Sequence, residues 1–417
     1  MCERVESICP EGVGLRLDGT PIARPMFSCS AETALMSPPK IRMAGIAAYS
    51  TRGLDFALNN GLAMTANGRL WASWIAGEDG PGAFTVASYS DDCGETWSDV
   101  ALVIDGHGDR PGDTGDRGLT SIIGTFWLDP DGVFHLFTDQ SLGHFDGRAG
   151  FWESICFNAD APSPVWSVPR RLGHGHLLNK PIVLANGHWA LSGYLNWVQK
   201  GSDEQKRAFP ELDGERGATC YVSTGNGQSW EKRGTARFPG KDWQEAQLVQ
   251  LKDGVLRTFA RVKDGAVGRM MAADSKDEGW SWSAPFILPS MDNPNARFQV
   301  VRLASGRLLF VTHGAPSDGG KDGQGRDHLT AYLSEDDGKT WIGGLMLFEG
   351  ESSYPDVCQG PDGVICVTND HDRGGAAEIW FHRFYEEDIL SRHIVSSRGR
   401  LGLLVCRGGQ TSKNHRG

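Results

Sequence analysis

Short runs of alternating apolar and polar residues recur along most of this chain. Clear examples are LWASWIA (70–76), GVFHLFTD (132–139), HWALSGYL (188–195) and RLLFVTHG (307–314). Each run is rich in aromatic or branched residues and is bounded by Gly, Asp or Asn, as β-strands are. Only FYEEDILSRH (384–393) has a helical pattern. The pattern therefore predicts an all-β protein.

Two series of signals divide the chain into repeating units. A residue-Gly dipeptide typical of hairpin turns occurs at intervals of 64, 55, 67, 52 and 57 residues. The dipeptides are Asn67-Gly68, Asp131-Gly132, Asn186-Gly187, Asp253-Gly254, Ser305-Gly306 and Asp362-Gly363. A second series consists of Trp97, Trp166, Trp230, Trp282 and Trp341, at intervals of 69, 64, 52 and 59 residues. Repetition of this kind is typical of propellers and other repeat architectures.

Four of these tryptophans end an eight-residue motif, S-x-D-x-G-x-[TS]-W. SDDCGETW (90–97), SKDEGWSW (275–282) and SEDDGKTW (334–341) match it, whereas STGNGQSW (223–230) carries Gly225 in place of the Asp. Ser and Asp side chains close tight turns by bonding to nearby backbone, and Gly readily adopts a positive φ. The Trp ring is expected to pack between neighbouring sheets. We therefore interpret the motif as a structural turn, not as a catalytic site.

Each unit consists of a strand, a residue-Gly turn, a strand, a longer loop, a strand, the eight-residue motif and a strand. Five units with a Trp and a sixth turn predict a six-bladed β-propeller of four-stranded antiparallel blades, with seven blades as the alternative. We expect an N-terminal extension over 1–50 that contributes a strand to close the ring, a single propeller over 51–405 and a C-terminal tail over 406–417. The helical segment at 384–393 is expected to cap the last blade.

The charge and composition of the chain limit which partners, cofactors and cellular locations we expect. The formal net charge of −11 disfavours nucleic acid and anionic membrane as general partners. No segment approaches the roughly 20 apolar residues of a membrane span, and the first thirty residues lack a secretory signal pattern. The nine cysteines show no metal-ligand spacing, which favours free thiols in a reducing compartment. We expect a cytoplasmic location, or a secreted one if the start is misassigned, no cofactor and no metal. The oligomeric state stays open.

The eight-residue motif resembles the Asp box of sialidases, and four further residues extend that resemblance. These are Glu245 in WQEAQLVQLKDG, Arg261 in LRTFARV, Arg326 in GRDHLTAYLSEDDG and Tyr354 in SSYPDV. They occur in the order found in the sialidase family. The resemblance implies that Tyr354 is a nucleophile, that Glu245 is its base, and that Arg261 and Arg326 hold the carboxylate of an acidic sugar.

The resemblance also implies an acid that protonates the leaving group. Glu78 or Asp79, in the loop after 70–76, corresponds to this acid, and the sequence does not choose between them. An arginine expected at the start of the first blade is missing, because residues 57–61 read ALNNG. Asn60 in this stretch is taken as a binding residue.

A narrower resemblance to bacterial sialidase-like propellers rests on LLNKPIVLANGHW, NARFQVVRLASGRLLFV, SSYPD and EIWFHRFYEEDIL. It implies that five more residues lie close to the pocket: Arg117, Asn179, Lys180, Arg297 and Arg373. The leading function is therefore an exo-acting glycoside hydrolase that removes an acidic terminal sugar from a carbohydrate.

Two alternatives remain open. One is a polysaccharide lyase or an enzyme acting on rhamnose–glucuronate linkages, which would need a His or Tyr base. His144, His174, His176, His313 and His371 are candidates, and the sequence selects none of them. The other alternative is a propeller that binds carbohydrate without catalysis. The combination of Glu245 with Tyr354 argues against pure binding, because a binding site needs no base beside a phenol.

Overall fold

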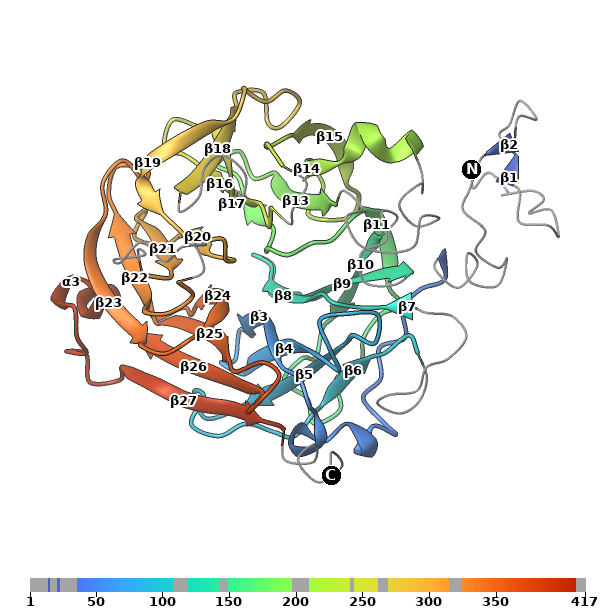
Figure 1. The fold of residues 1–417 in the computed structure, drawn as a ribbon, viewed down its shortest axis with the longest axis vertical. Helices are drawn as coiled ribbons and strands as arrows, with labels where there is room; N and C mark the ends of the chain where they lie inside the picture. Colours follow the sequence, from blue (N-terminus) through green and yellow to red (C-terminus); the bar gives the residue numbers. More distant parts are fainter. Residues whose placement is uncertain are drawn as a thin grey trace.

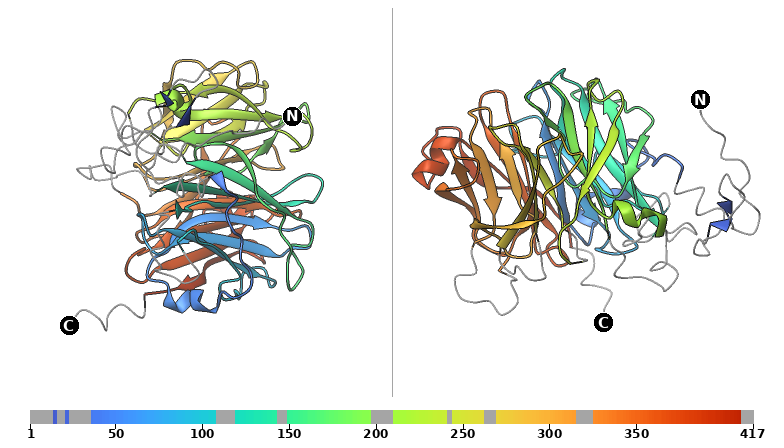
Figure 2. Two further views of the ribbon diagram at one scale, coloured as in Figure 1. Left: turned by 90° about the vertical axis from the view of Figure 1, so that its right-hand side faces the viewer. Right: turned by 90° about the horizontal axis from the view of Figure 1, so that it is seen from above.

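The structure is a computed structural model that describes residues 14–15, 21–22, 36–107, 119–142, 149–196, 210–240, 244–261, 269–314 and 325–409. Within these residues, six antiparallel sheets form a ring around a central axis (Figure 1). In side view the sheets stand next to one another around the ring, and their strands run along its depth (Figure 2). The six-bladed prediction is confirmed, and the seven-bladed alternative is wrong.

Each blade takes its strands from one continuous stretch of sequence. The innermost strands are β3 (Leu58–Met64), β8 (Gly124–Leu128), β12 (Ile182–Val183), β16 (Gln247–Gln250), β20 (Gln299–Arg302) and β24 (Ser353–Gln359). The second strands are β4 (Leu70–Ala76), β9 (Phe134–Leu142), β13 (Trp189–Leu195), β17 (Leu256–Arg261), β21 (Leu308–Thr312) and β25 (Ile365–His371).

The outer half of each blade completes the antiparallel order. The third strands are β5 (Phe84–Ser90), β10 (Gly150–Cys156), β14 (Gly217–Ser223), β18 (Arg269–Ser275), β22 (Leu329–Ser334) and β26 (Glu378–Phe384). The outermost strands are β6 (Leu102–Ile104), β11 (Arg170–His174), β15 (Glu231–Ala236), β19 (Phe286–Asp292), β23 (Ile342–Phe348) and β27 (Arg400–Arg407). A short β7 (Leu119–Thr120) also pairs with β9.

Because strand direction alternates within each blade, different loops lie at the two ends of the ring. Residue-Gly turns join the first and second strands, and Asp boxes join the third and fourth, so both kinds of turn lie at one end. The loops between second and third strands, and the starts of the innermost strands, lie at the other end. The charged candidates of the sequence belong to this second set of segments.

The hydrophobic core lies between adjacent blades, as the alternating pattern requires. One cluster joins the last blade to the first and contains Leu62, Trp74 and Phe381, all fully buried. Five other interfaces are filled in the same way. Because a strand presents alternate side chains to opposite faces, each blade buries both faces against its two neighbours.

The Asp boxes form the turns that their residues predict. In the third intact box, Gly338 N–H donates to Ser334 Oγ at 2.8 Å, and Thr340 N–H and Oγ1 donate to the two oxygens of Asp336 at 2.8 and 2.7 Å. The Gly has a φ of 84°. The Trp341 ring lies 5.1 Å from the Phe310 ring. The boxes are therefore structural turns with their Trp side chains packed in the inter-blade core.

Within the described residues, the ring closes without exchange of a strand. We expected the N-terminal extension to complete the last blade, but β24 to β27 supply all four strands of that blade from consecutive sequence. An N-terminal residue, Arg42, instead forms a β-bridge with Val103 at the outer edge of the first blade. All four strand positions of this blade are already occupied, so none is left for the extension to complete. The strand β27 also extends the propeller to Arg407, two residues beyond the expected boundary.

The remaining elements are small. The helix α3 (Glu386–Ser391) confirms the helical pattern near the C-terminus, and it packs against β23 of the preceding blade. The others are β1 (Gly14–Leu15), β2 (Pro21–Ile22), η1 (Ala47–Tyr49), η2 (Thr51–Gly53) and η3 (Pro210–Glu215). No helix in the described part has the length and apolar character needed to cross a membrane.

Candidate active site

The candidate residues gather where the innermost strands begin, at the end of the ring opposite the Asp boxes. Tyr354 is the second residue of β24, and Glu245 lies two residues before β16. Both hold a positive φ, 49° at Tyr354 and 44° at Glu245. Such a conformation costs a bulky residue roughly 1–3 kcal/mol, and it clusters at functional sites where the surrounding structure holds it in place.

A hydrogen bond and an ion pair join the two strained residues to a cation. Tyr354 donates its phenol hydrogen to Oε1 of Glu245. The same oxygen lies 3.0 Å from Nη2 of Arg261, and this pair is almost fully buried. The second oxygen of Glu245 is buried without a hydrogen-bond partner among the described residues. The structure thus brings Tyr354, Glu245 and Arg261 into contact.

Two further arginines reach this group from the last two blades. The guanidinium carbon of Arg373, in the loop after β25, lies 4.5 Å from the centroid of the Tyr354 ring. Its Nε donates to Asp370 at 3.0 Å. Arg326, in the loop before β22, acts on Tyr354 through its charge, as Arg261 and Arg373 do. Three cations from three consecutive blades therefore surround the phenol.

Burial and the neighbouring charges determine the pKa of the Tyr354 phenol. Burial, and then the carboxylate of Glu245, raise the pKa of Tyr354 to about 12, although the three arginines act in the opposite direction. Tyr354 therefore keeps its proton near neutral pH. It becomes a good nucleophile only when a neighbour accepts that proton, and Glu245 is the carboxylate in contact with it.

The loop between β4 and β5 distinguishes the two candidates for the acid. Oε1 of Glu78 accepts a hydrogen bond from Gly82 N–H at 2.6 Å, so this side chain folds back on its own loop. Asp79 is exposed. Burial acts to lower the pKa of Arg373, but Asp370, then Tyr354 and then the charge of Asp79 raise it above its usual value. The charge of Asp79 thus acts on the arginine group, while Glu78 bonds to its own loop.

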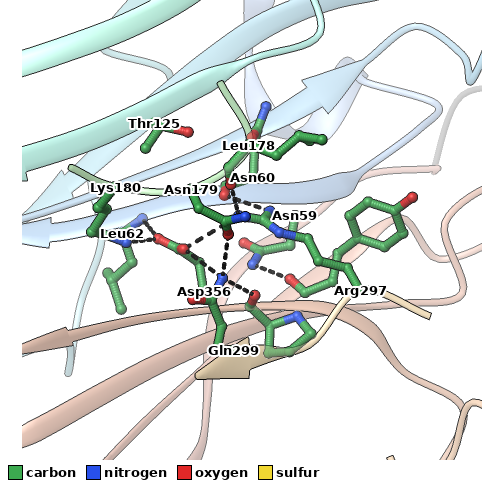
Figure 3. Close-up of polar contacts among 12 residues, drawn as sticks. Asn59, Asn60, Leu62, Thr125, Leu178, Asn179, Lys180, Arg297, Gln299 and Asp356 are labelled. Carbon is green, nitrogen blue, oxygen red and sulfur yellow. Dashed lines mark hydrogen bonds and ion pairs between the residues drawn. The ribbon is translucent and has the colours of Figure 1, made fainter. Parts of the chain in front are cut away.

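Three residues expected to bind substrate belong to a network with Asp356 (Figure 3). Arg297 is fully buried, donates from Nη1 to the carbonyl of Asn60 at 2.9 Å and reaches Asp356 with Nη2 at 3.4 Å. Lys180 forms an ion pair with Asp356. Asn60 donates its side-chain amide to the carbonyl of Ile122. Most buried polar groups of this network bond to one another, as buried polar groups generally must, whereas Arg297 Nε and Asn60 Oδ1 have no partner among the described residues. We therefore infer a structural role for Arg297, Lys180 and Asn60.

The remaining expected site residues fall partly within and partly outside the described residues. Arg117 and His144 lie outside the described residues. Asn179 donates to the carbonyl of Ala246, the residue after Glu245, at 2.6 Å, and so it supports that segment from the axis. No three His, Cys, Asp or Glu side chains gather as metal ligands would within the part of the chain that the structure describes.

Within the described residues, none of the histidines proposed as the base of a lyase reaction bonds to the phenol of Tyr354. His313 is buried near Arg326 and Arg373, and burial followed by these two charges lowers its pKa to about 3. His176 pairs with Asp139 at 2.5 Å, and His174 contacts Arg171. His371 contacts the carbonyl of Glu351. A histidine with a pKa near 3 is a weak general base at neutral pH.

Sequence reasoning missed Asn59 and Asp370. Asn59 is the second residue of β3, in the stretch where the missing arginine was expected, and its N–H donates to Oδ2 of Asp370 at 3.0 Å. Asp370, near the end of β25, also holds Arg373. No motif marks either residue, because their pairing depends on how the last blade meets the first.

Comparisons with known proteins agree with this fold. The profile of the BNR repeat-like domain matches residues 68–367. The chain resembles the leech intramolecular trans-sialidase complexed with 2,7-anhydro-Neu5Ac, with a TM-score of 0.60 and 12% identity over 85% of this chain and 71% of that chain. The intramolecular trans-sialidase from Ruminococcus gnavus gives a TM-score of 0.59 and 13% identity over 85% and 99% of the two chains.

A third similar structure is the K499G mutant of NanB sialidase from Streptococcus pneumoniae, with a TM-score of 0.56 and 15% identity over 80% of this chain and 67% of that chain. A comparison with curated proteins gave no match. Identities this low establish the fold alone. The domain match, by contrast, covers well over half of the chain and agrees with the ring of six blades and its Asp boxes. The chain belongs to the BNR repeat-like domain family and has the propeller fold of the sialidases.

Proposed function

We propose that this protein is a glycoside hydrolase that removes an acidic terminal sugar from a glycan. The observation that carries the proposal is the contact of Tyr354 with Glu245 among three arginines. Guanidinium groups bind carboxylates through paired hydrogen bonds, so Arg261, Arg326 and Arg373 suit an anionic sugar. Arg373 takes the place of the arginine that is missing from the first blade.

The proposed reaction has two steps. Tyr354 attacks the anomeric carbon while Glu245 accepts the phenol proton, and Asp79 protonates the departing oxygen. Water, deprotonated by Asp79, then attacks the same carbon, and Tyr354 recovers its proton as the sugar leaves. A neutral phenol suits this substrate, because a carboxylate nucleophile would be repelled by the anionic group of the sugar.

Product analysis tests the reaction class. The full chain is incubated with a panel of sialylated and uronate-terminated oligosaccharides, and products are identified by mass spectrometry. Hydrolysis adds one water to the two fragments, whereas elimination gives an unsaturated sugar that absorbs in the ultraviolet. We expect hydrolysis by the wild-type protein and no product above background from Tyr354→Phe.

Three results contradict the proposal. An unsaturated product indicates a lyase on this scaffold, and undiminished hydrolysis by Tyr354→Phe removes the nucleophile from the mechanism. Binding of an acidic glycan by calorimetry without any turnover indicates the non-catalytic alternative.

A further inference from the structure

Asn59 has contacts that link the first blade to the proposed nucleophile. It is fully buried, and its Nδ2 donates to the main-chain carbonyl of Tyr354 at 2.6 Å and to that of Thr368 at 3.2 Å. Its main-chain N–H donates to Asp370, the carboxylate that holds Arg373. One residue thus touches both the backbone of the nucleophile and the support of an arginine beside it.

The backbone of Tyr354 requires such support. A φ of 49° is unfavourable for a tyrosine, and relaxation to a negative φ would rotate the side chain away from its present position. The following residue, Pro355, disfavours the right-handed helical conformation at Tyr354 but does not by itself select a positive φ. The conformation is therefore held by bonds from outside the strand.

The residues after Tyr354 are fixed in the same way (Figure 3). Gln299 donates to the carbonyl of Pro355 at 3.1 Å and to Oδ1 of Asp356 at the same distance. Asp356 also accepts the N–H of Leu62 at 2.6 Å and pairs with Lys180. Because these donors come from the first and fifth blades and from the segment before β12, the start of β24 is fixed from several directions.

We propose that Asn59 is a positioning residue that holds Tyr354 in its strained conformation and so keeps the phenol on Glu245. The inference rests on the proposed role of Tyr354 as nucleophile. In the sialidase family that this chain resembles, an arginine is expected at the start of the first blade. In this chain Asn59 lies there and supports the nucleophile. The third cation, Arg373, comes from the last blade. Gln299 and Asp356 extend the same support to the next two residues.

The variant Asn59→Leu tests this, because it removes both side-chain hydrogen bonds, retains the N–H to Asp370 and changes the volume little. Turnover is measured with 4-methylumbelliferyl N-acetylneuraminide and 4-methylumbelliferyl β-glucuronide. We expect kcat to fall about 100-fold, as for a catalytic group displaced by about 1 Å, while KM stays within about threefold because the arginines are untouched. Thr125→Val is the matched control, since it removes a buried inter-blade bond at 3.0 Å that touches neither Tyr354 nor Glu245.

Crystal structures of the wild type and Asn59→Leu provide a readout that needs no substrate. We expect Tyr354 to relax to a negative φ in the variant and its phenol to leave Glu245. An unchanged conformation overturns the inference, whatever the activity. The kinetics distinguish a failure of this inference from a failure of the proposed function. Wild-type kcat in Asn59→Leu with an inactive Tyr354→Phe contradicts only the positioning role, whereas an active Tyr354→Phe contradicts the nucleophile itself.

Discussion

At the scale of single residues, Arg373 shows how a side chain acquires a role through its surroundings. It is mostly buried, lies over the ring of Tyr354 and is held by Asp370 at 3.0 Å. A guanidinium fixed in this way loses little further freedom when it binds an anion. Its second terminal nitrogen, Nη2, is buried without a partner among the described residues. This geometry suits the role that we propose for Arg373, which is to bind the anionic group of a substrate.

Replacing this guanidinium tests the clamp. We expect Arg373→Gln to raise KM for an acidic substrate by about 10- to 150-fold, the effect of a lost hydrogen bond of roughly 1.5–3 kcal/mol to a charged group. Arg257→Gln is the control, because Arg257 pairs with Asp274 at the opposite end of the ring and should leave KM unchanged. Equal KM values for the two variants would exclude Arg373 from substrate binding.

His313 gives a prediction on pH and stability. Its pKa falls from 6.5 to about 3 in the folded protein, because of burial and then of the charges of Arg326 and Arg373. Between these two values the unfolded chain binds more protons than the folded one, so stability is lost as the pH falls from about 6.5 towards 3. The slope is about 1.4 kcal/mol per pH unit for one histidine. We expect His313→Leu to reduce the slope of unfolding free energy against pH by this amount, measured by urea unfolding. An unchanged slope would show that His313 does not titrate in this way.

At the scale of elements, the four Asp boxes form the same turn, but one of them lacks the hydrogen bonds of the Asp side chain. The intact boxes bond the Asp carboxylate to the N–H and hydroxyl of the Thr or Ser four residues later. The box at 223–230 keeps the bond from Gly227 N–H to Ser223 at 2.9 Å, but Gly225 has no side chain to bond to Ser229. The turn persists because the glycine conformation and the serine bond remain.

This difference predicts a stabilising substitution. A Cβ at Gly225 meets open space, and the residue has no positive φ, so Gly225→Asp fits without strain. It should stabilise the protein by about 1–2 kcal/mol, through hydrogen bonds to Ser229 and a less flexible unfolded chain. Gly225→Ala should give only the smaller stabilisation that comes from a less flexible unfolded chain. Thermal unfolding of both variants measures the difference, and a destabilised Gly225→Asp would refute this account of the box.

At the scale of the whole molecule, the ring is held closed by apolar packing and by polar contacts across its axis. Lys180 precedes the third blade and pairs with Asp356 in the sixth, while Arg297 joins the fifth blade to the first. Asp356 is almost fully buried. These contacts join segments far apart in sequence, as strand exchange would. They also adjoin the proposed nucleophile, because the guanidinium carbon of Arg297 lies 6.0 Å from the centroid of the Tyr354 ring and Asp356 is two residues after Tyr354. Ring closure and site geometry therefore depend on the same residues.

Breaking the pair across the axis should therefore cost much stability. We expect Lys180→Met to lower the unfolding free energy by about 3–5 kcal/mol, because it removes one partner of a buried pair. Lys232→Met, which breaks a pair with Glu215 at the surface, should cost about 0–1 kcal/mol. Urea unfolding compares the two, and similar losses would mean that the axial pair does not hold the ring.

The sequence by itself determined the repeating parts of this protein. Alternation, residue-Gly turns and Asp boxes act over a few residues, so they specify the six blades and the end of the ring at which each loop emerges. The ordered series Glu245, Arg261, Arg326 and Tyr354 likewise identified the segments that carry the proposed site. Only the tertiary structure decided what the isolated polar residues do. Arg297, Lys180 and Asn60 became part of the axial network, Arg373 joined the arginine group, and Asn59 and Asp370 acquired their contacts, because the last blade meets the first only when the ring closes. Contacts between residues about 300 positions apart leave no local pattern, whereas a turn is recorded in its own residues.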